Sequence, residues 1–237
     1  MELNRYIDHT LLKADATPEQ IAKLCAEAKE YRFASVCVNS CYVPLAAKLL
    51  SGTDTKVCCV VGFPLGACLS EAKAAETRLA VEAGAEEVDM VINIGMAKAG
   101  DWDYVRKDIA AVAAAAHPKA IVKVIIECCL LTDDEKVTAC LAAKEAGADF
   151  VKTSTGYGTA GAKIADVALM RRTVSDRVRV KASGGIRNLD TVLSCRAVGA
   201  ARCGVSATEA IMEEAIRRER EGTLVMPENL TEMNGGY

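Results

Sequence analysis

The chain of 237 residues is long enough to bury one large core, and 51% of its residues are hydrophobic. With 29 Lys and Arg against 32 Asp and Glu, the formal net charge is -3, and aromatic residues make up only 4%. The sequence contains no basic run and no alternation of basic with aromatic residues. Composition therefore excludes a nucleic-acid-binding surface.

Membrane insertion and metal binding also lack a sequence signal. No apolar stretch approaches the roughly 20 residues that a membrane helix needs, and the segment MELNRYIDHT does not have the layout of a signal peptide. We therefore expect a cytoplasmic protein. The eleven cysteines lie mostly in apolar runs, which is typical of reduced, buried thiols. No zinc-ligand spacing occurs, and we expect neither a metal nor another cofactor.

Short β-branched runs alternate with Ala-rich helical stretches along the chain. The pattern predicts strands over residues 6–10, 34–39, 56–63, 87–93, 120–127, 150–155, 178–183 and 202–206. It predicts helices over residues 17–31, 40–50, 70–83, 101–116, 132–146, 162–174, 188–198 and 206–221. Eight strand-helix units of this length predict a single-domain (β/α)8 TIM barrel over residues 1–221, followed by a flexible tail over residues 222–237.

Local signals support several of these boundaries. Capping boxes, in which a hydroxyl residue precedes a carboxylate or amide by three positions, are expected at Thr17 with Gln20, Thr132 with Glu135, and Ser206 with Glu209. Glycines that suit a left-handed helix end follow five of the helices, at Gly52, Gly84, Gly147, Gly199 and Gly222.

Charged residues gather on one face of the predicted strands. Because side chains alternate across a strand, Val122, Val124 and Ile126 share one face. Lys123 and Glu127 share the other face, and the same division places Asp89, Lys152 and Lys181 opposite apolar neighbours. The apolar faces can pack under the helices. We therefore expect the charges to point into the barrel lumen.

A buried charge costs several kcal/mol unless it is paired, so a structural ion-pair layer is the simplest explanation for one such lysine. Three lysines, at positions 123, 152 and 181, would share two carboxylates, those of Asp89 and Glu127. At least one amine would then lack a full partner and be driven towards its neutral form. A neutral amine is a nucleophile that forms a Schiff base with a carbonyl.

Glycines follow the seventh and eighth predicted strands. Gly184 and Gly185 follow Ser183, and Gly204 precedes Ser206 at the start of the last helix. These loops are where barrels of this class commonly bind phosphate, through backbone N–H groups and a helix N-terminus. Tight turns alone would explain the same glycines equally well.

The segment Gly156-Tyr157-Gly158-Thr159-Ala160-Gly161 matches a dinucleotide-binding fingerprint, with an acidic residue, Asp176, twenty positions further on. The motif lies in the sixth unit, however, and the next strand ends in Lys181-Ala182-Ser183 rather than in an acidic residue. We interpret it as a flexible substrate loop.

Several segments together resemble the deoxyribose-phosphate aldolase family from Tyr6 to about Ala215. They are Asp8-His9-Thr10-Leu11-Leu12, Ala34-Ser35-Val36-Cys37-Val38-Asn39, Val61-Gly62-Phe63-Pro64-Leu65-Gly66, Glu87-Val88-Asp89-Met90-Val91-Ile92-Asn93, Phe150-Val151-Lys152-Thr153-Ser154-Thr155-Gly156 and Lys181-Ala182-Ser183-Gly184-Gly185-Ile186-Arg187. Each segment is weak alone, but the set is specific.

The resemblance implies a metal-independent lyase that reversibly cleaves 2-deoxy-D-ribose 5-phosphate to acetaldehyde and D-glyceraldehyde 3-phosphate. It implies that Lys152 forms the Schiff base, that Lys181 favours the neutral form of Lys152, and that Asp89 transfers protons with Lys181 and a water. It also implies that a C-terminal tyrosine, here Tyr237, assists proton transfer at the enamine carbon. The family is often dimeric, so we expect a homodimer.

The resemblance assigns substrate and phosphate binding to Thr155, Gly156, Gly184, Gly185, Gly204 and Ser206. The residues expected beside the active site are Cys37, Lys123, Glu127, Asp8 and Thr10. Several family members have a lysine at the position of Tyr157 and a second serine at the position of Ala207, so phosphate binding is expected to be weaker or built differently here. Cys37 matches a cysteine that some members lose to aldehyde adducts, and His9 and His117 are left without a role.

Two other functions remain open from the residues alone. Another barrel lyase or isomerase of sugar phosphates would share the phosphate loops without using Lys152 covalently. A catalytically silent barrel that binds sugar phosphates would need neither lysine chemistry nor turnover. Trapping with acetaldehyde and borohydride distinguishes all three possibilities.

Overall fold

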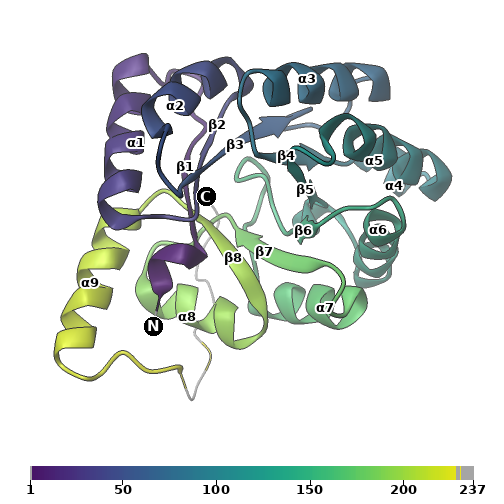
Figure 1. The fold of residues 1–237 in the computed structure, drawn as a ribbon. Coiled ribbons are helices and arrows are strands. Elements are labelled where there is room, and N and C mark those ends of the chain that lie inside the picture. Colours follow the sequence, from purple (N-terminus) through teal and green to yellow (C-terminus); the bar gives the residue numbers. More distant parts are fainter. Residues whose placement is uncertain (1, 228–229, 231–237) are drawn as a thin grey trace.

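The computed structural model describes residues 2–227 and 230, and within them the strands close into one parallel barrel in the order β1 to β8 (Figure 1). The strands are β1 (Ile7–Leu11), β2 (Ser35–Val38), β3 (Lys56–Val61), β4 (Glu87–Val91), β5 (Ile121–Ile125), β6 (Phe150–Lys152), β7 (Arg179–Ser183) and β8 (Ala200–Val205). Pairing of His9 on β1 with Val205 on β8 closes the ring. The predicted (β/α)8 barrel is confirmed.

The helices surround the barrel on its outer side (Figure 1). They are α1 (Pro18–Tyr31), α2 (Val43–Leu50), α3 (Ser70–Glu82), α4 (Ile94–Lys98), α5 (Trp102–Ala116), α6 (Asp133–Glu145), α7 (Ile164–Val174), α8 (Leu189–Ala197) and α9 (Thr208–Arg220). Short 3-10 turns occur at Leu3–Tyr6, Ser40–Tyr42 and Cys128–Leu130. No helix in the described ranges is long and apolar enough to cross a membrane.

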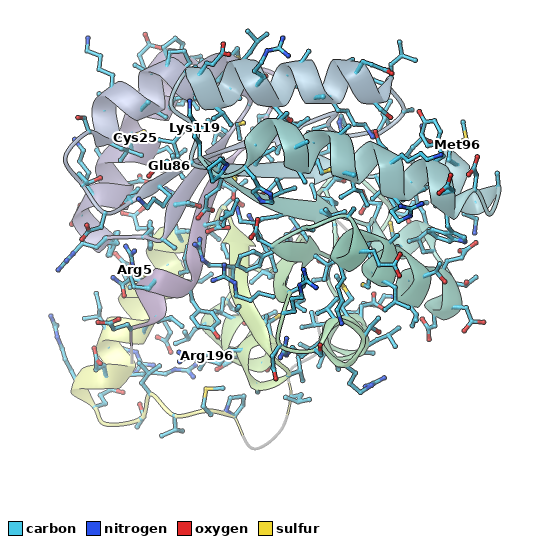
Figure 2. All side chains as sticks on the ribbon, turned by 45° about the vertical axis from the view of Figure 1, so that its right-hand side comes forward. Arg5, Cys25, Glu86, Met96, Lys119 and Arg196 are labelled. Carbon is cyan, nitrogen blue, oxygen red and sulfur yellow. The ribbon has the colours of Figure 1, made fainter. Side chains whose placement is uncertain are left out.

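Helix α4 was not expected from the sequence. Its residues follow β4 directly, and the side chain of Asn93 accepts a hydrogen bond from the backbone N–H of Met96 at 3.1 Å, which begins a helical turn. Figure 2 shows Met96 on this short helix at the outer edge of the molecule, well away from the barrel axis. The addition therefore leaves the barrel topology unchanged.

The helix ends follow the sequence signals with one exception. Both partners of the capping boxes are present at Thr17 and Thr132. The capping box expected at Ser206 is wrong, because α9 begins two residues later and its N-cap is Ala207, which has no side chain that can accept a hydrogen bond. The five glycines expected at helix ends all have positive φ angles.

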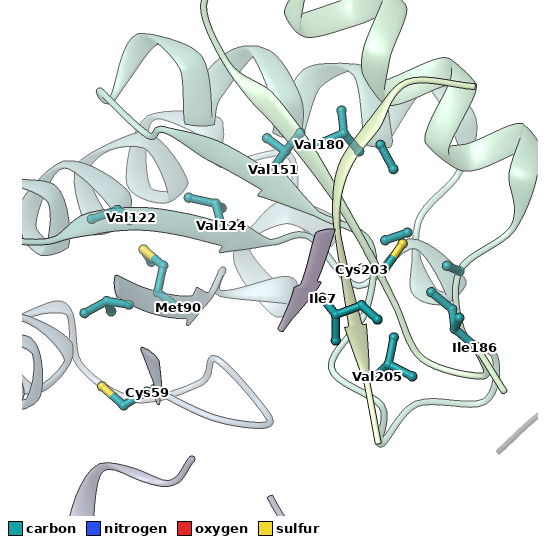
Figure 3. Close-up of a cluster of buried hydrophobic side chains, with 14 of the residues drawn as sticks. Ile7, Cys59, Met90, Val122, Val124, Val151, Val180, Ile186, Cys203 and Val205 are labelled. Atoms are coloured by element: carbon teal, nitrogen blue, oxygen red, sulfur yellow. The ribbon is translucent and has the colours of Figure 1, made fainter. Parts of the chain in front are cut away.

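The main hydrophobic core lies between the barrel wall and the helices. Val122, Val124 and Ile126, which were predicted to face the helices, are fully buried in this core. Figure 3 shows Val122, Val124, Val151 and Val180 projecting from neighbouring strands into the same layer. Burying one such side chain stabilises the fold by about 1.5–3 kcal/mol, so this shell holds the strands rigidly. The polar faces of those strands are left to line the lumen.

Candidate active site

Consecutive strands bring the three predicted lysines and Asp89 together inside the barrel. Asp89 on β4 pairs in register with Lys123 on β5, and Lys152 on β6 pairs with Lys181 on β7. All four side chains are buried. The predicted lumen face is therefore confirmed for these residues.

The carboxylate of Asp89 contacts all three amines. Its Oδ1 atom accepts a hydrogen bond from Lys123 Nζ at 2.9 Å. Its Oδ2 atom accepts hydrogen bonds from Lys152 Nζ at 2.7 Å and from Lys181 Nζ at 2.8 Å. Burial raises the pKa of Asp89, but the three ammonium groups more than offset that effect and hold the pKa well below its ordinary value. Asp89 is therefore ionised at neutral pH, and the three lysines converge on it.

Two further carboxylates and one guanidinium complete the charged layer. Lys181 Nζ lies 2.6 Å from Asp8 Oδ2, and Lys123 Nζ lies 2.6 Å from Glu87 Oε2. Arg202 donates to Asp8 Oδ1 and, at 2.9 Å, to Glu87 Oε1. Each of these two carboxylates is thus held by Arg202 on one side and by a lysine on the other.

The charges in this layer do not balance. Among the described residues that meet there, four are cationic, Lys123, Lys152, Lys181 and Arg202, and three are anionic, Asp8, Glu87 and Asp89. Loss of one proton from one lysine would make the layer neutral. Because unbalanced buried charge is costly, the arrangement favours the neutral amine form of one lysine over a fourth cation.

Lys152 has the fewest carboxylate contacts of the three lysines. Lys123 and Lys181 each contact two carboxylates, and although burial lowers their pKa values, these anions raise both pKa values above the ordinary value. Lys152 contacts a single carboxylate oxygen, which it shares with Lys181. Of the three lysines, Lys152 therefore has the least compensation from nearby anions.

Lys152 is also the lysine that faces open space. A cavity of about 260 Å³ opens at the carboxyl ends of the strands, and Lys152 is the member of the charged layer that lines it. The cavity is lined by Thr10, Leu11, Leu12, Lys13, Lys152, Thr155, Gly156, Tyr157, Ser183, Gly184, Gly185, Ile186, Arg187, Gly204, Val205 and Ser206. All six residues expected to bind substrate and phosphate thus lie around one cavity, together with Thr10.

Glu127 does not belong to the charged layer, which corrects the expected ion pairs. Its carboxylate accepts hydrogen bonds from the backbone N–H of Thr155 at 3.2 and 3.3 Å and from the Thr155 hydroxyl. Glu127 lies two residues after the end of β5, and its positive φ of 55° starts the 3-10 turn Cys128–Leu130, which directs its side chain towards the next loop. Asp8 and Glu87 take the place that Glu127 was expected to fill.

The loop after β6 is fixed by contacts at several points. The Thr155 hydroxyl accepts a hydrogen bond from the N–H of Tyr157 at 3.0 Å. The Tyr157 hydroxyl donates to the carbonyl of Leu12 at 2.7 Å, and its ring meets Phe63 edge to face. This loop is the segment that resembles a dinucleotide fingerprint, and these contacts hold it across the cavity mouth.

Cys37, Cys58 and Asp89 form one group, within the described ranges, whose atoms could hold a metal ion. Their sulfur and oxygen atoms lie within 4.8 Å of one another. Both oxygens of Asp89, however, already accept hydrogen bonds from lysines, and Cys58 donates to Oδ1 at 3.2 Å. Burial raises the pKa of the Cys58 thiol well above its ordinary value, which favours the protonated form. A cation here would have to displace an ammonium group.

Sequence reasoning missed Glu87 and Arg202. Glu87 lies two residues before Asp89 on β4, and Arg202 lies two residues before Gly204 on β8. Because alternate side chains of a strand share a face, this spacing would have placed both residues in the lumen. Tyr237, expected to act from the tail, lies outside the described residues.

Active sites of (β/α)8 barrels lie at the carboxyl ends of the strands. In this chain the buried amines lie beneath a cavity at that end, which is typical of a barrel enzyme. A family model described as DeoC/LacD family aldolase matches residues 3–213. The chain belongs to this family, and it is a lyase of the aldolase type.

Curated relatives match nearly the whole chain. The deoxyribose-phosphate aldolase of Clostridium tetani (strain Massachusetts / E88) is 59% identical over 215 residues, which cover 91% of this chain and 100% of the relative. That of Streptococcus gordonii is 60% identical over 213 residues, which cover 90% and 96%. The solved structure of the tetrameric deoxyribose phosphate aldolase from Aeropyrum pernix is 33% identical, with a TM-score of 0.84 and 91% of each chain covered.

Proposed function

We propose that this aldolase reversibly cleaves 2-deoxy-D-ribose 5-phosphate to acetaldehyde and D-glyceraldehyde 3-phosphate, and that Lys152 carries the substrate as a Schiff base. One observation carries the assignment of Lys152. It is the buried lysine that has the fewest carboxylate contacts and that lines the cavity. The high identity to deoxyribose-phosphate aldolases over 91% of the chain supports the choice of substrate.

The first step attaches the sugar to the enzyme. Neutral Lys152 attacks the C1 aldehyde of the open-chain sugar, and the C1 oxygen leaves as water after protonation, which gives a protonated imine. Asp89 and Lys181 lie within hydrogen-bond distance of one another beside the attacking nitrogen, so a water held there can move the protons. Asp8 holds Lys181 in place from the other side.

The second step breaks the carbon–carbon bond. Removal of the C3 hydroxyl proton lets the C2–C3 bond break. The electron pair of that bond forms the C1–C2 double bond of an enamine, and the π pair of the imine moves to its nitrogen. C3 leaves as the aldehyde carbon of D-glyceraldehyde 3-phosphate. Protonation of C2 and addition of water at C1 then release acetaldehyde and restore the amine of Lys152. The layer of fixed charges lowers the cost of each proton transfer because its dipoles need not reorganise.

The phosphate group fits the glycine-lined wall of the cavity. Gly184 and Gly185 have φ angles of 85° and 74°, a region that exposes backbone N–H groups without a side chain in the way. Ser206 lies just before α9, whose N-terminus favours an anion. Two exposed cations, Lys13 and Arg187, line the same cavity. They supply positive charge that Tyr157 cannot provide.

Borohydride trapping tests this function. Acetaldehyde and borohydride together should reduce an imine and add an ethyl group at Lys152, which peptide mass analysis detects. A labelled lysine other than Lys152 would refute the assigned role. Another sugar-phosphate lyase or isomerase would turn over without a label, and a silent binding barrel would show neither turnover nor a label.

Several further features of the proposal await separate tests. We assign the enzyme to the cytoplasm as a homodimer, and sedimentation would distinguish a dimer from the tetramer described for the Aeropyrum pernix relative.

We divide the chain into a barrel over residues 1–221 and a tail over residues 222–237 that brings Tyr237 to the site. Deletion of Tyr237 should slow deuterium exchange into acetaldehyde while Lys152 is still trapped by borohydride. An exchange rate equal to that of the full chain would remove Tyr237 from the mechanism.

A further inference from the structure

His9 bridges two helices from the outer face of the barrel. It lies on β1 between Asp8 and Thr10, and its side chain points away from the lumen because side chains alternate along the strand. Its Nε2 atom lies 2.7 Å from Glu27 Oε2 on α1, and its Nδ1 atom lies 2.9 Å from the Thr208 hydroxyl at the first residue of α9. His9 and Thr208 are both buried. The ring therefore links β1, α1 and the start of α9.

The network fixes the direction of each hydrogen bond. Burial lowers the pKa of His9, against the opposing effect of Glu27, so the ring is neutral at pH 7. The Glu27 carboxylate can only accept, which places the ring proton on Nε2. Nδ1 is then an acceptor, and the Thr208 hydroxyl must donate to it. The backbone position of Thr208 is thereby tied to a rigid strand.

The start of α9 needs such an anchor because it lacks the usual one. Its N-cap, Ala207, offers no side-chain acceptor to the first N–H groups of the helix. Those groups stay free for an anion, but the first turn loses the hydrogen bond that would normally hold it. Ser206 lines both the substrate cavity and a second cavity on the side of His9, so this turn forms the wall between them.

We propose that His9 is a positioning residue for phosphate recognition, which acts through Thr208 to hold the first turn of α9 against the phosphate. The inference rests on the proposed function, because it takes the cavity beside Ser206 as the phosphate site. His9 does not line the substrate cavity, and its hydrogen-bond partners lie outside the charged layer, so its effect is on binding of the phosphate group. The neighbouring residue, Asp8, holds Lys181 on the opposite side of the same strand.

Two variants of Thr208 provide the first test. Thr208→Val keeps the shape of the side chain and removes its hydroxyl, whereas Thr208→Ser keeps the hydroxyl. Loss of one hydrogen bond should raise the KM for 2-deoxyribose 5-phosphate, and the inhibition constant of inorganic phosphate, about five-fold in the valine variant. Thr208→Ser should behave like the wild type. kcat, and KM for unphosphorylated 2-deoxyribose, should change less than about two-fold.

Variants of the histidine provide the second test. His9→Phe keeps a ring beside Phe33, which lies 5.3 Å away between ring centroids, and removes both nitrogen atoms. It should reproduce the effect of Thr208→Val, and combining the two should add little further loss. His9→Asn keeps an acceptor near the position of Nδ1 and should restore part of the phosphate preference. His117→Phe is the matched control, because His117 also pairs with a carboxylate, Asp149, at 2.9 Å.

The outcomes separate this inference from the function on which it rests. If the wild-type enzyme prefers the phosphorylated sugar and Thr208→Val and His9→Phe keep that preference, the positioning role is refuted and the proposed function stands. If the wild-type enzyme shows no preference and phosphate does not compete, both fail. A variant that only melts at lower temperature, with an unchanged ratio of KM values, shows a purely structural network and also overturns the proposal. Should His9→Phe not fold, the two Thr208 variants decide.

Discussion

Two buried Lys–Asp arrangements in this barrel differ in their charge balance. Outside the strands, Lys73 on α3 contacts Asp108 on α5 at 2.5 Å and also donates to the carbonyl of Val91 at 2.9 Å. Both side chains are fully buried. In the lumen, Asp89 contacts three lysines, and the layer around it holds one more cation than anions. The first arrangement is a closed neutral pair, and the second is not.

The comparison shows that burial of a lysine does not by itself indicate a reactive amine. Lys73 has one carboxylate of its own and a carbonyl, so its ammonium form is satisfied. Lys152 shares one carboxylate oxygen with a second ammonium group and lines a cavity. We expect substitution of Lys73 to affect stability and substitution of Lys152 to affect chemistry.

The largest effect is expected for Lys152→Ala. Cleavage should fall by more than about 10³-fold, because the covalent step is lost, while the free energy of unfolding should change by less than about 1 kcal/mol, since Lys152 has the fewest anionic contacts in the layer. Steady-state kinetics and urea unfolding measure the two effects. The exposed residue Lys163 serves as the control, and Lys163→Ala should retain wild-type activity. Imine trapping that persists in Lys152→Ala would contradict the assignment.

The next largest effect is expected for Lys73→Met. Removing one partner of a closed buried pair leaves Asp108 as an uncompensated anion, which should cost about 3–5 kcal/mol of unfolding free energy. Activity per folded molecule should stay near the wild-type value. Lys56→Met is the matched control, because the pair of Lys56 with Glu86 is exposed and should be worth less than about 1 kcal/mol. Equal losses in the two variants would show that burial does not distinguish these pairs.

A smaller effect is expected for Lys181→Leu. Without this neighbouring cation, the ammonium form of Lys152 is less unfavourable, so borohydride trapping should require a higher pH. Trapping yield against pH measures the shift, and it is independent of whether cleavage survives. Lys136→Leu removes a lysine that pairs with Asp166 outside the lumen, and its trapping profile should match that of the wild type. A profile unaltered by Lys181→Leu would mean that the charge of Lys181 does not tune Lys152.

The last effect concerns acid stability. Burial raises the pKa values of Asp8 and Asp89, but nearby cations more than offset this. Lys181 and Arg202 hold the pKa of Asp8 below its ordinary value, and the three lysines do the same for Asp89. These carboxylates stabilise the fold fully above their unfolded pKa of about 4, and that contribution falls as the pH drops further, by up to about 1.4 kcal/mol per pH unit for each group. Urea midpoints at pH 6, 4 and 3 should therefore decrease. Asp89→Asn should be less stable at pH 6 and show a flatter pH dependence, and a midpoint that stays constant down to pH 3 in the wild type would refute the sign.

Strand periodicity was sufficient to predict the barrel and the meeting of Lys123, Lys152 and Lys181, because both depend on local alternation. It could not predict that Glu127 turns away, since this follows from a positive φ at a single residue. The capping box expected at Ser206 was also wrong. The hydroxyl and carboxylate spacing occurs there, but β8 ends at Val205 and the helix begins only at Thr208.

The site was predicted less completely than the fold. Asp8 came from the resemblance, whereas Glu87 and Arg202 were missed although parity would have placed them in the lumen. His9 was left without a role because its two partners, Glu27 and Thr208, are 18 and 199 positions away in the sequence. Contacts over such separations depend on tertiary packing, which no local pattern encodes. A neutral pair such as Lys73 with Asp108 is equally invisible in the sequence.

Lys13 and Arg187 at the cavity mouth have a consequence for how quickly substrate arrives. The chain as a whole carries a formal charge of -3, which repels a sugar phosphate at long range. Within about 8 Å, the screening length at physiological ionic strength, the two exposed cations place positive charge at the mouth. Encounter with a phosphorylated sugar is therefore steered locally and slows as salt is added, whereas encounter with an uncharged aldehyde does not depend on salt. The two directions of one reversible reaction thus begin with encounters of different electrostatic character.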